Sequence, residues 1–255
     1  MENKLIREGR FGPPKCWKTG AVVSTYPRPL LTLEVDKNGL DVINEPIVEL
    51  TPEELIMSVK LPRSELPPLS FVDISKLSRN DLPMDLNMPP NAEGWPGFHK
   101  VAKTLITSCP YRTVVIDSFT SLQKLLYGYI VSTSPAQLAD ARKWAFTIGQ
   151  KVDQVISAFA MLPNTHVVFI FHEDQEKNEL TSEINTNPML YSKLRLYTGG
   201  ILSQFFYQKM EGGKAVLYTQ ATGFVKGIGA RWPDLMNRPK ITPPTFNEIY
   251  GKDVK

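Results

Sequence analysis

The segment with the clearest chemical pattern runs from residue 12 to residue 19 and reads Gly-Pro-Pro-Lys-Cys-Trp-Lys-Thr. It differs at one position from the phosphate-binding pattern G-x-x-x-x-G-K-[ST], because Trp17 stands where the second glycine is expected. In that pattern, backbone amides wrap the phosphates, the lysine reaches the outer phosphates and the hydroxyl coordinates Mg²⁺. The candidate nucleotide-binding residues are therefore Gly12, Pro13, Pro14, Lys15, Cys16, Trp17, Lys18 and Thr19.

Trp17 puts hydrolysis in doubt more than binding, because glycine tolerates backbone angles and a close phosphate approach that a Cβ obstructs. If the loop still turns its amides toward phosphate, Lys18 and Thr19 remain useful, and Lys15 can add a second cation. The alternative is an ordinary Gly-Pro-Pro turn followed by a surface Lys-Thr pair, with Lys15 solvated. The segment before the loop, residues 4–11, is more polar than a central strand should be, which argues against a phosphate loop.

Two further candidates stand at the ends of apolar segments. Asp117 follows residues 113–116, and His172 follows residues 167–171. At the carboxyl end of a buried strand, an aspartate can hold magnesium and a histidine can sense the outermost phosphate. The alternatives are an Asp-Ser helix cap before Phe119 and an ordinary loop histidine.

Glu34 and Asp36 follow a third apolar segment and lie two residues apart, which places both on one side of an extended chain. One of them can activate water as a general base, and the alternative is a solvated turn closed by Asn38-Gly39. Together the four candidate sites deliver polar groups to one edge of one sheet, which chance explains poorly.

The elements that must position these residues indicate an α/β fold. Continuous apolar segments at 30–33, 113–116 and 167–171 are typical of strands buried on both faces of a parallel sheet. Helical spacing predicts helices over about 97–107 and from Ser134-Pro135 to about residue 159. Residues 204–210 and 214–220 form a predicted hairpin. We expect one domain over 1–255, with a Pro-rich irregular insertion at about 45–95, at most a small hairpin and extended chain, and a Pro-rich tail at about 232–255.

Composition excludes several classes of protein. With 255 residues, 42% hydrophobic and 22% charged, the chain is an ordinary globular one rather than a disordered one. It has no apolar segment long enough to span a membrane, and its first residues are charged and lack a signal-peptide core. Two cysteines make no disulfide framework, so we expect a cytoplasmic protein. A net charge of +3 permits nucleic-acid binding without demonstrating it.

Together these motifs resemble the RecA-like P-loop ATPases, specifically the compact phage-type group related to single-strand annealing and recombination ATPases. The resemblance rests on residues 12–19, on Val114–Ser118, on the strand closed by His172 and on the ending Lys226–Arg231. It covers residues 5 to 250, although 45–95 match only loosely. It implies a mostly parallel central sheet flanked by helices and followed by a C-terminal β-hairpin.

The resemblance also implies ATP and Mg²⁺ as cofactors. It implies Lys18 on the phosphates, Thr19 and Asp117 at the metal, and His172 as the sensor. Asp36 matches the water-activating carboxylate of the family, with Glu34 as the second choice.

In ring-forming members of the family, basic residues near the carboxyl end reach a neighbour's nucleotide, and Lys226 and Arg231 resemble these. Further copies of the chain, in a homo-oligomer, are therefore among the partners that the resemblance allows, although the glycines around both residues also fit a flexible surface loop.

Single-stranded DNA would contact residues 173–198, where basic and aromatic residues interleave at Tyr191, Lys193, Arg195 and Tyr197. Against this, Leu190, Leu194 and Ile201 fit one face of a helix, which is slightly favoured. Four acidic residues in the same stretch would also repel DNA locally, namely Glu173, Asp174, Glu176 and Glu179.

The leading hypothesis is an ATP-binding and ATP-hydrolysing accessory protein of DNA recombination or replication that acts with single-stranded DNA. Its partners would be further copies of the chain or recombination and replication proteins, in the host cytoplasm if the chain is of phage origin. The main alternative is a non-catalytic RecA-like interaction module with a degenerate nucleotide site. A small-molecule phosphotransferase is a third hypothesis, which Arg195 alone supports thinly.

Overall fold

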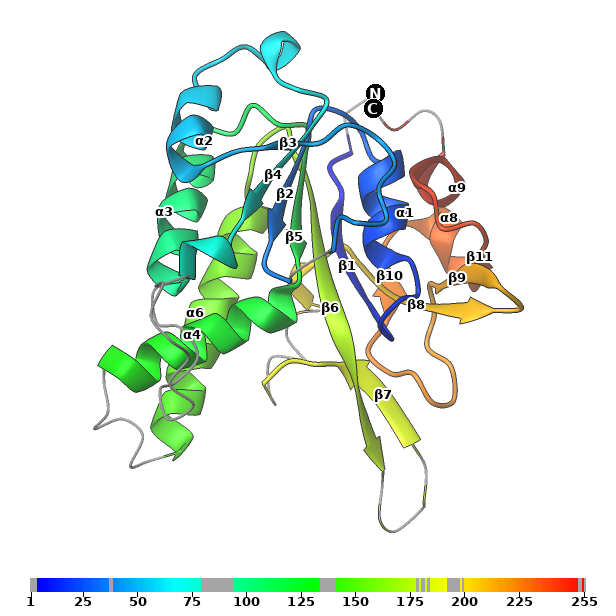
Figure 1. Cartoon of the computed structure of the whole chain (residues 1–255). Helices are drawn as coiled ribbons and strands as arrows, with labels where there is room; N and C mark the ends of the chain where they lie inside the picture. The colour runs from blue at the N-terminus through cyan, green and yellow to red at the C-terminus, as the bar shows by residue number, and fades with distance from the viewer. Residues whose placement is uncertain are drawn as a thin grey trace.

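A mostly parallel β-sheet forms the middle layer of the molecule, with helices on both faces (Figure 1). The structure is a computed structural model that describes residues 4–36, 39–78, 94–133, 141–177, 179, 182, 184–191, 198, 200–251 and 254. The strands are β1 (Arg7–Gly12), β2 (Leu30–Glu34), β3 (Val48–Glu49), β4 (Leu69–Asp73), β5 (Thr113–Asp117), β6 (His166–Lys177), β7 (Ile184–Pro188), β8 (Gln204–Glu211), β9 (Lys214–Tyr218), β10 (Gly229–Ala230) and β11 (Lys240–Ile241). The helices are α1 (Lys18–Thr25), α2 (Pro52–Ser58), α3 (Gly94–Thr107), α4 (Phe119–Thr133), α6 (Ala141–Ala160), α8 (Pro233–Met236) and α9 (Phe246–Tyr250).

The strand order is β11-β9-β8-β1-β6-β5-β2-β4-β3, with β10 beside β8 and β7 beside β6. From β8 to β3 every neighbouring pair in this order is parallel. β9 turns back antiparallel to β8 through Gly212 and Gly213, which both have positive φ angles, as a two-residue hairpin requires. The predicted α/β class, with a mostly parallel central sheet flanked by helices and a C-terminal hairpin, is confirmed.

Alternate residues of the inner strands pack into two separate cores. On one face, Val114 and Ile116 of β5 belong to a core that is covered by α3, α4 and α6. On the other face, Val115 of β5 packs with residues of α1 and α9. Figure 1 shows these two groups of helices on opposite sides of the sheet. The continuous apolar strands of the sequence are therefore buried on both faces, as predicted.

β1 is a central strand in spite of its polar sequence, which corrects the argument against it. Glu8 and Arg10 are fully buried and pair with each other, with 2.7 Å between Arg10 Nε and Glu8 Oε1. The hydroxyls of Tyr26 and Tyr250 donate to Glu8, and Arg10 also donates to Gln208 Oε1 at 3.0 Å. Because each charge is paired and hydrogen-bonded, the strand tolerates burial that isolated charges would forbid.

The expectation of an irregular segment at residues 45–95 is wrong for the part that the structure describes. Thr51 Oγ1 accepts a hydrogen bond from the amide of Glu54, and the Thr51 amide donates to Glu54 Oε2, so that the two residues together cap α2. Pro52 begins this helix instead of breaking it, because the first helical position needs no N–H donor. β3 and β4 are parallel neighbours and do not form a hairpin. Residues 79–93 lie outside the described part of the chain.

The other boundary predictions hold in part. The helix predicted to begin at Ser134-Pro135 ends as α6 at Ala160, and its start lies outside the described residues. The Pro-rich tail contains α8, β11 and α9, so it is structured. Its Phe246 packs edge-on against Tyr26, with 5.0 Å between ring centroids, and thereby fixes α9 against the end of α1.

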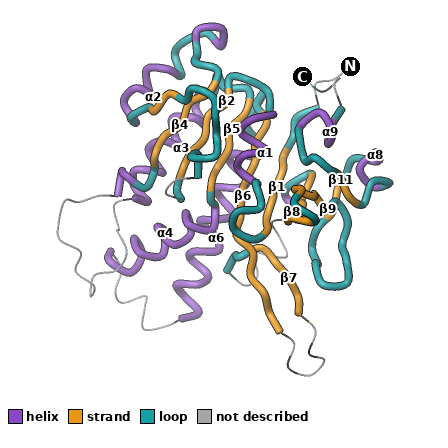
Figure 2. The backbone as a smooth tube through the Cα atoms, turned by 45° about the vertical axis from the view of Figure 1, so that its right-hand side comes forward, coloured by secondary structure: helices purple, strands orange, loops and turns teal. Residues whose placement is uncertain are grey.

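β6 continues past the body of the sheet and pairs with β7 as an antiparallel hairpin, which projects from the molecule in Figures 1 and 2. Residues 173–177, predicted to begin a DNA-binding loop or precede a helix, are therefore strand. None of the helices that the structure describes is both long and apolar enough to cross a membrane.

Candidate functional site

The predicted site residues converge because the strands that carry them are aligned. In the register of the sheet, Gly12 at the end of β1 lies beside His172 of β6, and Glu34 at the end of β2 lies beside Asp117 of β5. Carboxyl ends of parallel strands meet at one sheet edge, where open α/β sheets bind ligands. The structure therefore brings the candidate loop, Glu34, Asp117 and His172 to the same edge.

Gly12 must be glycine for reasons of space. A Cβ at this position would lie 1.9 Å from the backbone oxygen of Gln208 on β8. The chain leaves β1 here with a φ of +155° and enters the loop that leads to α1. The close contact with β8 fixes the position along β1 at which the loop begins.

Trp17 takes the backbone conformation that a glycine would supply. Its φ of 65° and ψ of 29° are left-handed, which costs about 1–2 kcal/mol for a residue with a Cβ. The indole lies against the first turn of α1, since a Cβ on Gly20 would meet Trp17 Nε1 at 2.0 Å. Trp17 therefore adopts the left-handed turn before α1 that a glycine would allow, and the missing side chain of Gly20 leaves room for the indole.

The start of α1 has no side-chain cap. Trp17 occupies the N-cap position and makes no side-chain hydrogen bond to the helix. The first amides of a helix have no partner within it, and the helix dipole favours an anion at this end. This arrangement is suited to binding phosphate.

Lys18 folds back onto its own loop. Its Nζ donates to the carbonyl oxygens of Gly12 at 2.9 Å and Pro13 at 2.7 Å. Its side chain is buried, and its charge is one of the influences that lower the pKa of Asp117. The ammonium therefore stays inside the loop, bonded to carbonyls that a phosphate would have to replace as its partners.

Gln208 anchors the loop from β8 and was missed by the sequence analysis. Its Nε2 donates to the carbonyl of Cys16 at 2.6 Å, and the Cys16 thiol donates to the Gln208 carbonyl at 3.2 Å. Burial raises the pKa of Cys16, which the nearby Lys18 partly offsets. Cys16 is thus a buried anchor. The sequence held no signal for Gln208, because β8 is far from the loop along the chain.

Thr19 and Asp117 join the loop to the second predicted motif. The Thr19 hydroxyl donates to Asp117 Oδ2, although β6 separates β1 from β5 in the sheet. Burial raises the pKa of Asp117 to about 6, against the lowering effect of the Thr19 hydrogen bond. A hydroxyl and a carboxylate placed together are oxygen ligands of the kind that Mg²⁺ prefers.

The alternative assignment of Asp117-Ser118 as a helix cap is also realised, by the second residue. Ser118 Oγ accepts a hydrogen bond from the amide of Ser121 at 3.1 Å and so caps α4. The two residues therefore divide the roles, because Asp117 faces Thr19 while Ser118 starts the helix.

Asp36 and His172 form a pair at the same edge. His172 Nε2 and Asp36 Oδ2 are 2.8 Å apart, and both side chains are partly exposed. Burial raises the pKa of Asp36, but the hydrogen bonds from His172, Ser121 and Ser118 outweigh it, and the pKa lies below its ordinary value. Asp36 is consequently an ionised partner for the imidazole.

Glu34 is the carboxylate with the pKa closest to neutrality. Burial raises its pKa to about 7, with Asp73 and Asp117 contributing, although the amide of Leu40 donates to Glu34 Oε1 at 3.1 Å. Gly39 packs between the acids, because its Cβ would lie 3.2 Å from Glu34 Oε1 and 3.4 Å from Asp117 Oδ2. A carboxylate tuned in this way can take a proton from water near pH 7.

The remaining candidates lie on other segments of the chain, after β7 and around β10. Lys226 and Arg231 are exposed and flank β10, which pairs with β8, so the predicted flexible loop is partly strand. Arg231 donates through its side chain to the Gly200 carbonyl. Of the predicted DNA contacts, Tyr191 is half-buried, whereas Lys193, Arg195 and Tyr197 fall outside the described residues.

Comparison with protein families decides the family of this chain. A model of the AAA domain matches residues 65–225, which is more than half of the sequence. The chain belongs to this AAA-domain family. The matched range includes Asp117 and His172 and begins after the loop at residues 12–19. No curated protein matches the sequence.

Two solved structures are similar at low identity. The RadB recombinase has a TM-score of 0.39 and 13% identity, covering 83% of this chain and 79% of its own. The KaiC-like protein PH0186 from the hyperthermophilic archaeon Pyrococcus horikoshii OT3 has a TM-score of 0.34 and 11% identity, covering 92% and 84%. Likenesses at this level carry no argument about what this chain does.

Proposed function

We propose that this AAA-domain protein binds ATP with Mg²⁺ at the loop of residues 12–19 and hydrolyses it. The proposal rests above all on one observation, the hydrogen bond from Thr19 to Asp117. This bond supports the proposal, because it places the hydroxyl of the loop against the carboxylate at the end of β5 in a chain with Trp17 at the pattern's second glycine position. The uncapped amino end of α1 supports the same proposal, because the first amides of a helix have no partner within it and are suited to a phosphate.

The residues of the edge can divide the work as follows. The amides at the start of α1 would hold the phosphates, and Lys18 would exchange its loop carbonyls for a phosphate oxygen. Thr19 and Asp117 would hold Mg²⁺, which neutralises phosphate charge when bound.

The proton acceptor is better assigned to Glu34 than to Asp36. A general base works best when its pKa is near the working pH. Burial brings the pKa of Glu34 to about 7, whereas hydrogen bonds keep that of Asp36 low. In this arrangement Asp36 orients His172, which stands beside Gly12 at the strand end and can respond to the outermost phosphate.

The setting proposed for this activity is DNA recombination or replication with single-stranded DNA, in a protein of the phage-type group. Lys226 and Arg231 would act on the nucleotide of a neighbouring copy, since both are exposed on the chain that carries them. This part of the proposal rests on the resemblance of the motifs.

The experiment is a measurement of Mg²⁺-dependent ATP turnover with and without single-stranded DNA. Turnover that DNA stimulates supports the full proposal. Lys18→Ala is expected to abolish turnover, and Glu34→Gln to lower it by about 10²-fold or more with nucleotide binding retained. Asp36→Asn should reduce turnover less than Glu34→Gln does.

The competing functions give different results. Tight ATP binding without turnover would support a non-catalytic interaction module, and turnover only with a small acceptor would support a phosphotransferase. Binding can be followed separately through the fluorescence of Trp17, with Trp17→Phe as the control for the other tryptophans. If neither binding nor turnover is detected at millimolar nucleotide, the proposal is wrong.

A further inference from the structure

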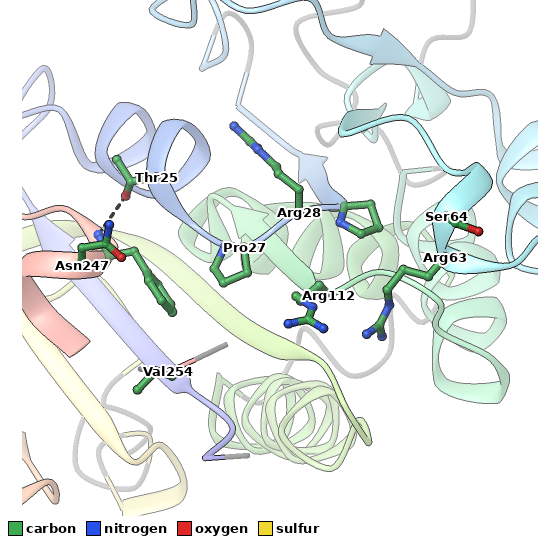
Figure 3. Close-up of a pocket in the computed structure, with 10 residues that line it drawn as sticks. Thr25, Pro27, Arg28, Arg63, Ser64, Arg112, Asn247 and Val254 are labelled. Atoms are coloured by element: carbon green, nitrogen blue, oxygen red, sulfur yellow. Dashed lines mark hydrogen bonds between the residues drawn. The ribbon is translucent and has the colours of Figure 1, made fainter. Parts of the chain in front are cut away.

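A basic pocket lies at the sheet edge opposite the candidate nucleotide site. It has a volume of about 830 Å³ and is lined where the chain enters β2 and β5, by the end of α1 and by α9. Three arginines line it, Arg28, Arg63 and Arg112, and the described residues of its lining include no acid (Figure 3). Arg112 immediately precedes β5, whose other end carries Asp117. The pocket is therefore separate from the loop of residues 12–19.

Arg112 is held by its backbone while its side chain is uncommitted. Its amide donates to the Pro29 carbonyl at 2.8 Å, and its carbonyl accepts from the amide of His166 at 2.7 Å. Within the described ranges, its guanidinium has no hydrogen-bond or ion-pair partner. A fixed backbone with an unused planar donor group is suited to recognising an anion.

Arg63 is oriented toward the same side. Its Nε donates to the Pro110 carbonyl at 2.7 Å and its Nη2 to the Asn164 carbonyl at 3.2 Å. These two bonds fix the guanidinium, and among the described residues Nη1 has no hydrogen-bond partner, so it can serve a ligand. Figure 3 shows the side chains of Arg63 and Arg112 pointing to the same side of the pocket, while that of Arg28 points the other way.

Arg28 adds positive charge that one acid only partly balances. Its Nη2 lies 3.1 Å from Oε2 of the exposed Glu45, and its Nη1 is buried and has no hydrogen-bond partner in the part of the chain that the structure describes. Burial lowers the pKa of Arg28, and the nearby Glu45 opposes this effect. Positive charge gathers here in the folded chain at an electrostatic cost that a bound anion would relieve.

We infer that this pocket binds a phosphate ester, held by the guanidinium groups of Arg112 and Arg63. The planar fork of arginine matches two phosphate oxygens at once. The volume exceeds the need of a bare phosphate ion and falls within the range of pockets that take nucleotide-sized ligands. Ser64 and Asn247, also in the lining, offer further hydrogen bonds. The phosphate can come from a free nucleotide or from the backbone of a nucleic-acid strand, and the inference does not depend on ATP binding at the loop.

The test measures binding of three probes to the full chain. Fluorescence anisotropy follows a 5′-fluorescein-labelled oligothymidylate, and AMP and inorganic phosphate serve as unlabelled ligands. The variants are Arg112→Gln, which removes the charge, and Arg112→Lys, which keeps the charge and loses the fork. Lys214→Gln, at the exposed hairpin of β8 and β9, is the control for Arg112→Gln, because it also removes one positive charge but lies outside the pocket. Lys18→Ala weakens any binding at the loop of residues 12–19, so that binding which remains in this variant can be assigned to the pocket.

We expect Arg112→Gln to weaken probe binding about tenfold or more, as the loss of a charge-assisted hydrogen bond predicts. Arg112→Lys should fall between Arg112→Gln and the wild type, and Lys214→Gln should change binding less than about twofold. Each phosphate contact makes oligonucleotide binding more sensitive to salt. The slope of log K against log salt concentration should therefore be smaller in Arg112→Gln than in the wild type. An unchanged Trp17 response to Mg-ATP and an unchanged melting temperature would show that Arg112→Gln is folded.

The two sources of phosphate are distinguished by competition. If AMP displaces the oligonucleotide from the wild type and from Lys18→Ala but not from Arg112→Gln, the pocket binds the phosphate of both a free nucleotide and a nucleic-acid strand. Binding of AMP alone with the same dependence on Arg112 supports a free nucleotide. The inference is overturned if Arg112→Gln and Arg112→Lys bind all probes as the wild type does, or if the wild type binds none of them.

Discussion

Trp17 shows that a bulky residue can hold a turn usually made by glycine. Its left-handed backbone angles preserve the entry to α1, and its indole lies over the space that Gly20 leaves free. A tryptophan at the glycine position of the pattern therefore costs backbone energy locally, and the Thr19 hydroxyl still donates to Asp117. The backbone cost of Trp17 can be measured by itself.

Two variants isolate this cost, because Trp17→Ala and Trp17→Gly both remove the indole. They differ in whether a Cβ sits at φ 65°. We expect the glycine variant to be more stable than the alanine variant by about 1 kcal/mol, since left-handed backbone is strained only for residues with a Cβ. The free energy of unfolding from urea titrations checks this. Equal stability of the two variants would mean that position 17 is not held in this conformation.

Glu34 makes the stability of the protein depend on pH. Its folded-state pKa of about 7 lies above the ordinary value of 4.5, so the folded state binds the proton more tightly than the unfolded state does. The free energy of unfolding therefore falls as the pH rises from about 4.5 to about 7. Asp117, raised from 3.8 to about 6, acts in the same direction over its own range.

Glu34→Gln should remove the contribution of Glu34 to this pH dependence. At pH 8 we expect the variant to be more stable than the wild type by about 1–2 kcal/mol, a value that allows for partial solvent screening. Near pH 4 the difference should vanish, because both forms are then neutral at position 34. Urea titrations at a series of pH values give the measurement. Glu65→Gln is the control at an exposed glutamate, and its stability difference from the wild type should not change with pH. A stability difference for Glu34→Gln that is the same at every pH would contradict the raised pKa of Glu34.

At the scale of elements, the loop is set by the contact between β1 and β8. Gly12 lies against the backbone of Gln208, and the Gln208 side chain holds the Cys16 carbonyl. The hairpin that contains β8 thus fixes one side of the candidate nucleotide site, and the strand β5 with Asp117 fixes the other.

Gly12→Ala tests this contact. A Cβ 1.9 Å from a backbone oxygen requires the strands to separate, so we expect a loss of about 2 kcal/mol or more in the free energy of unfolding, with weaker nucleotide binding. Gly149→Ala is the control, because this glycine lies inside α6 with open space around its Cβ position. It should raise stability by about 0.5–1 kcal/mol through helix propensity. Similar effects of the two changes would refute the packing argument.

At the scale of the whole molecule, a buried polar network ties together distant parts of the chain. Glu8 and Arg10 in the central strand are joined by Tyr26 after α1, Tyr250 in α9 and Gln208 in β8. Burial raises the pKa of both tyrosines well above the ordinary value, with the Glu8 charge contributing, so they remain hydrogen-bond donors. The network docks the structured tail onto the sheet.

Breaking one side of this network should be worse than removing its charges together. Arg10→Met leaves Glu8 buried without its cation and is expected to cost about 3–5 kcal/mol of unfolding free energy. The double variant Glu8→Gln with Arg10→Met removes both charges and keeps an acceptor for the tyrosines, so it should be more stable than Arg10→Met alone. A double-mutant cycle by chemical denaturation measures the coupling. Additive effects would mean that the two charges do not depend on each other.

Much of the fold could be predicted because apolar patterning is local information. The inner strands β2, β5 and β6, the end of α6 and the β8–β9 hairpin follow from continuous apolar segments and turn residues. The errors came from polar and proline residues whose partners are remote. Glu8 and Arg10 make β1 look exposed until Tyr250 is present, and Pro52 looks like a breaker until Thr51 caps the helix it begins.

The sequence by itself determined that Glu34, Asp117 and His172 stand at strand ends, because each follows or ends a continuous apolar segment along the chain. Only the tertiary structure decided how those groups differ, since pKa shifts and hydrogen bonds depend on neighbours far away in sequence. It separated Glu34 from Asp36 through burial and the His172 contact, and it brought Gln208 to the loop. It also gathered Arg63 and Arg112 from separate segments into one pocket.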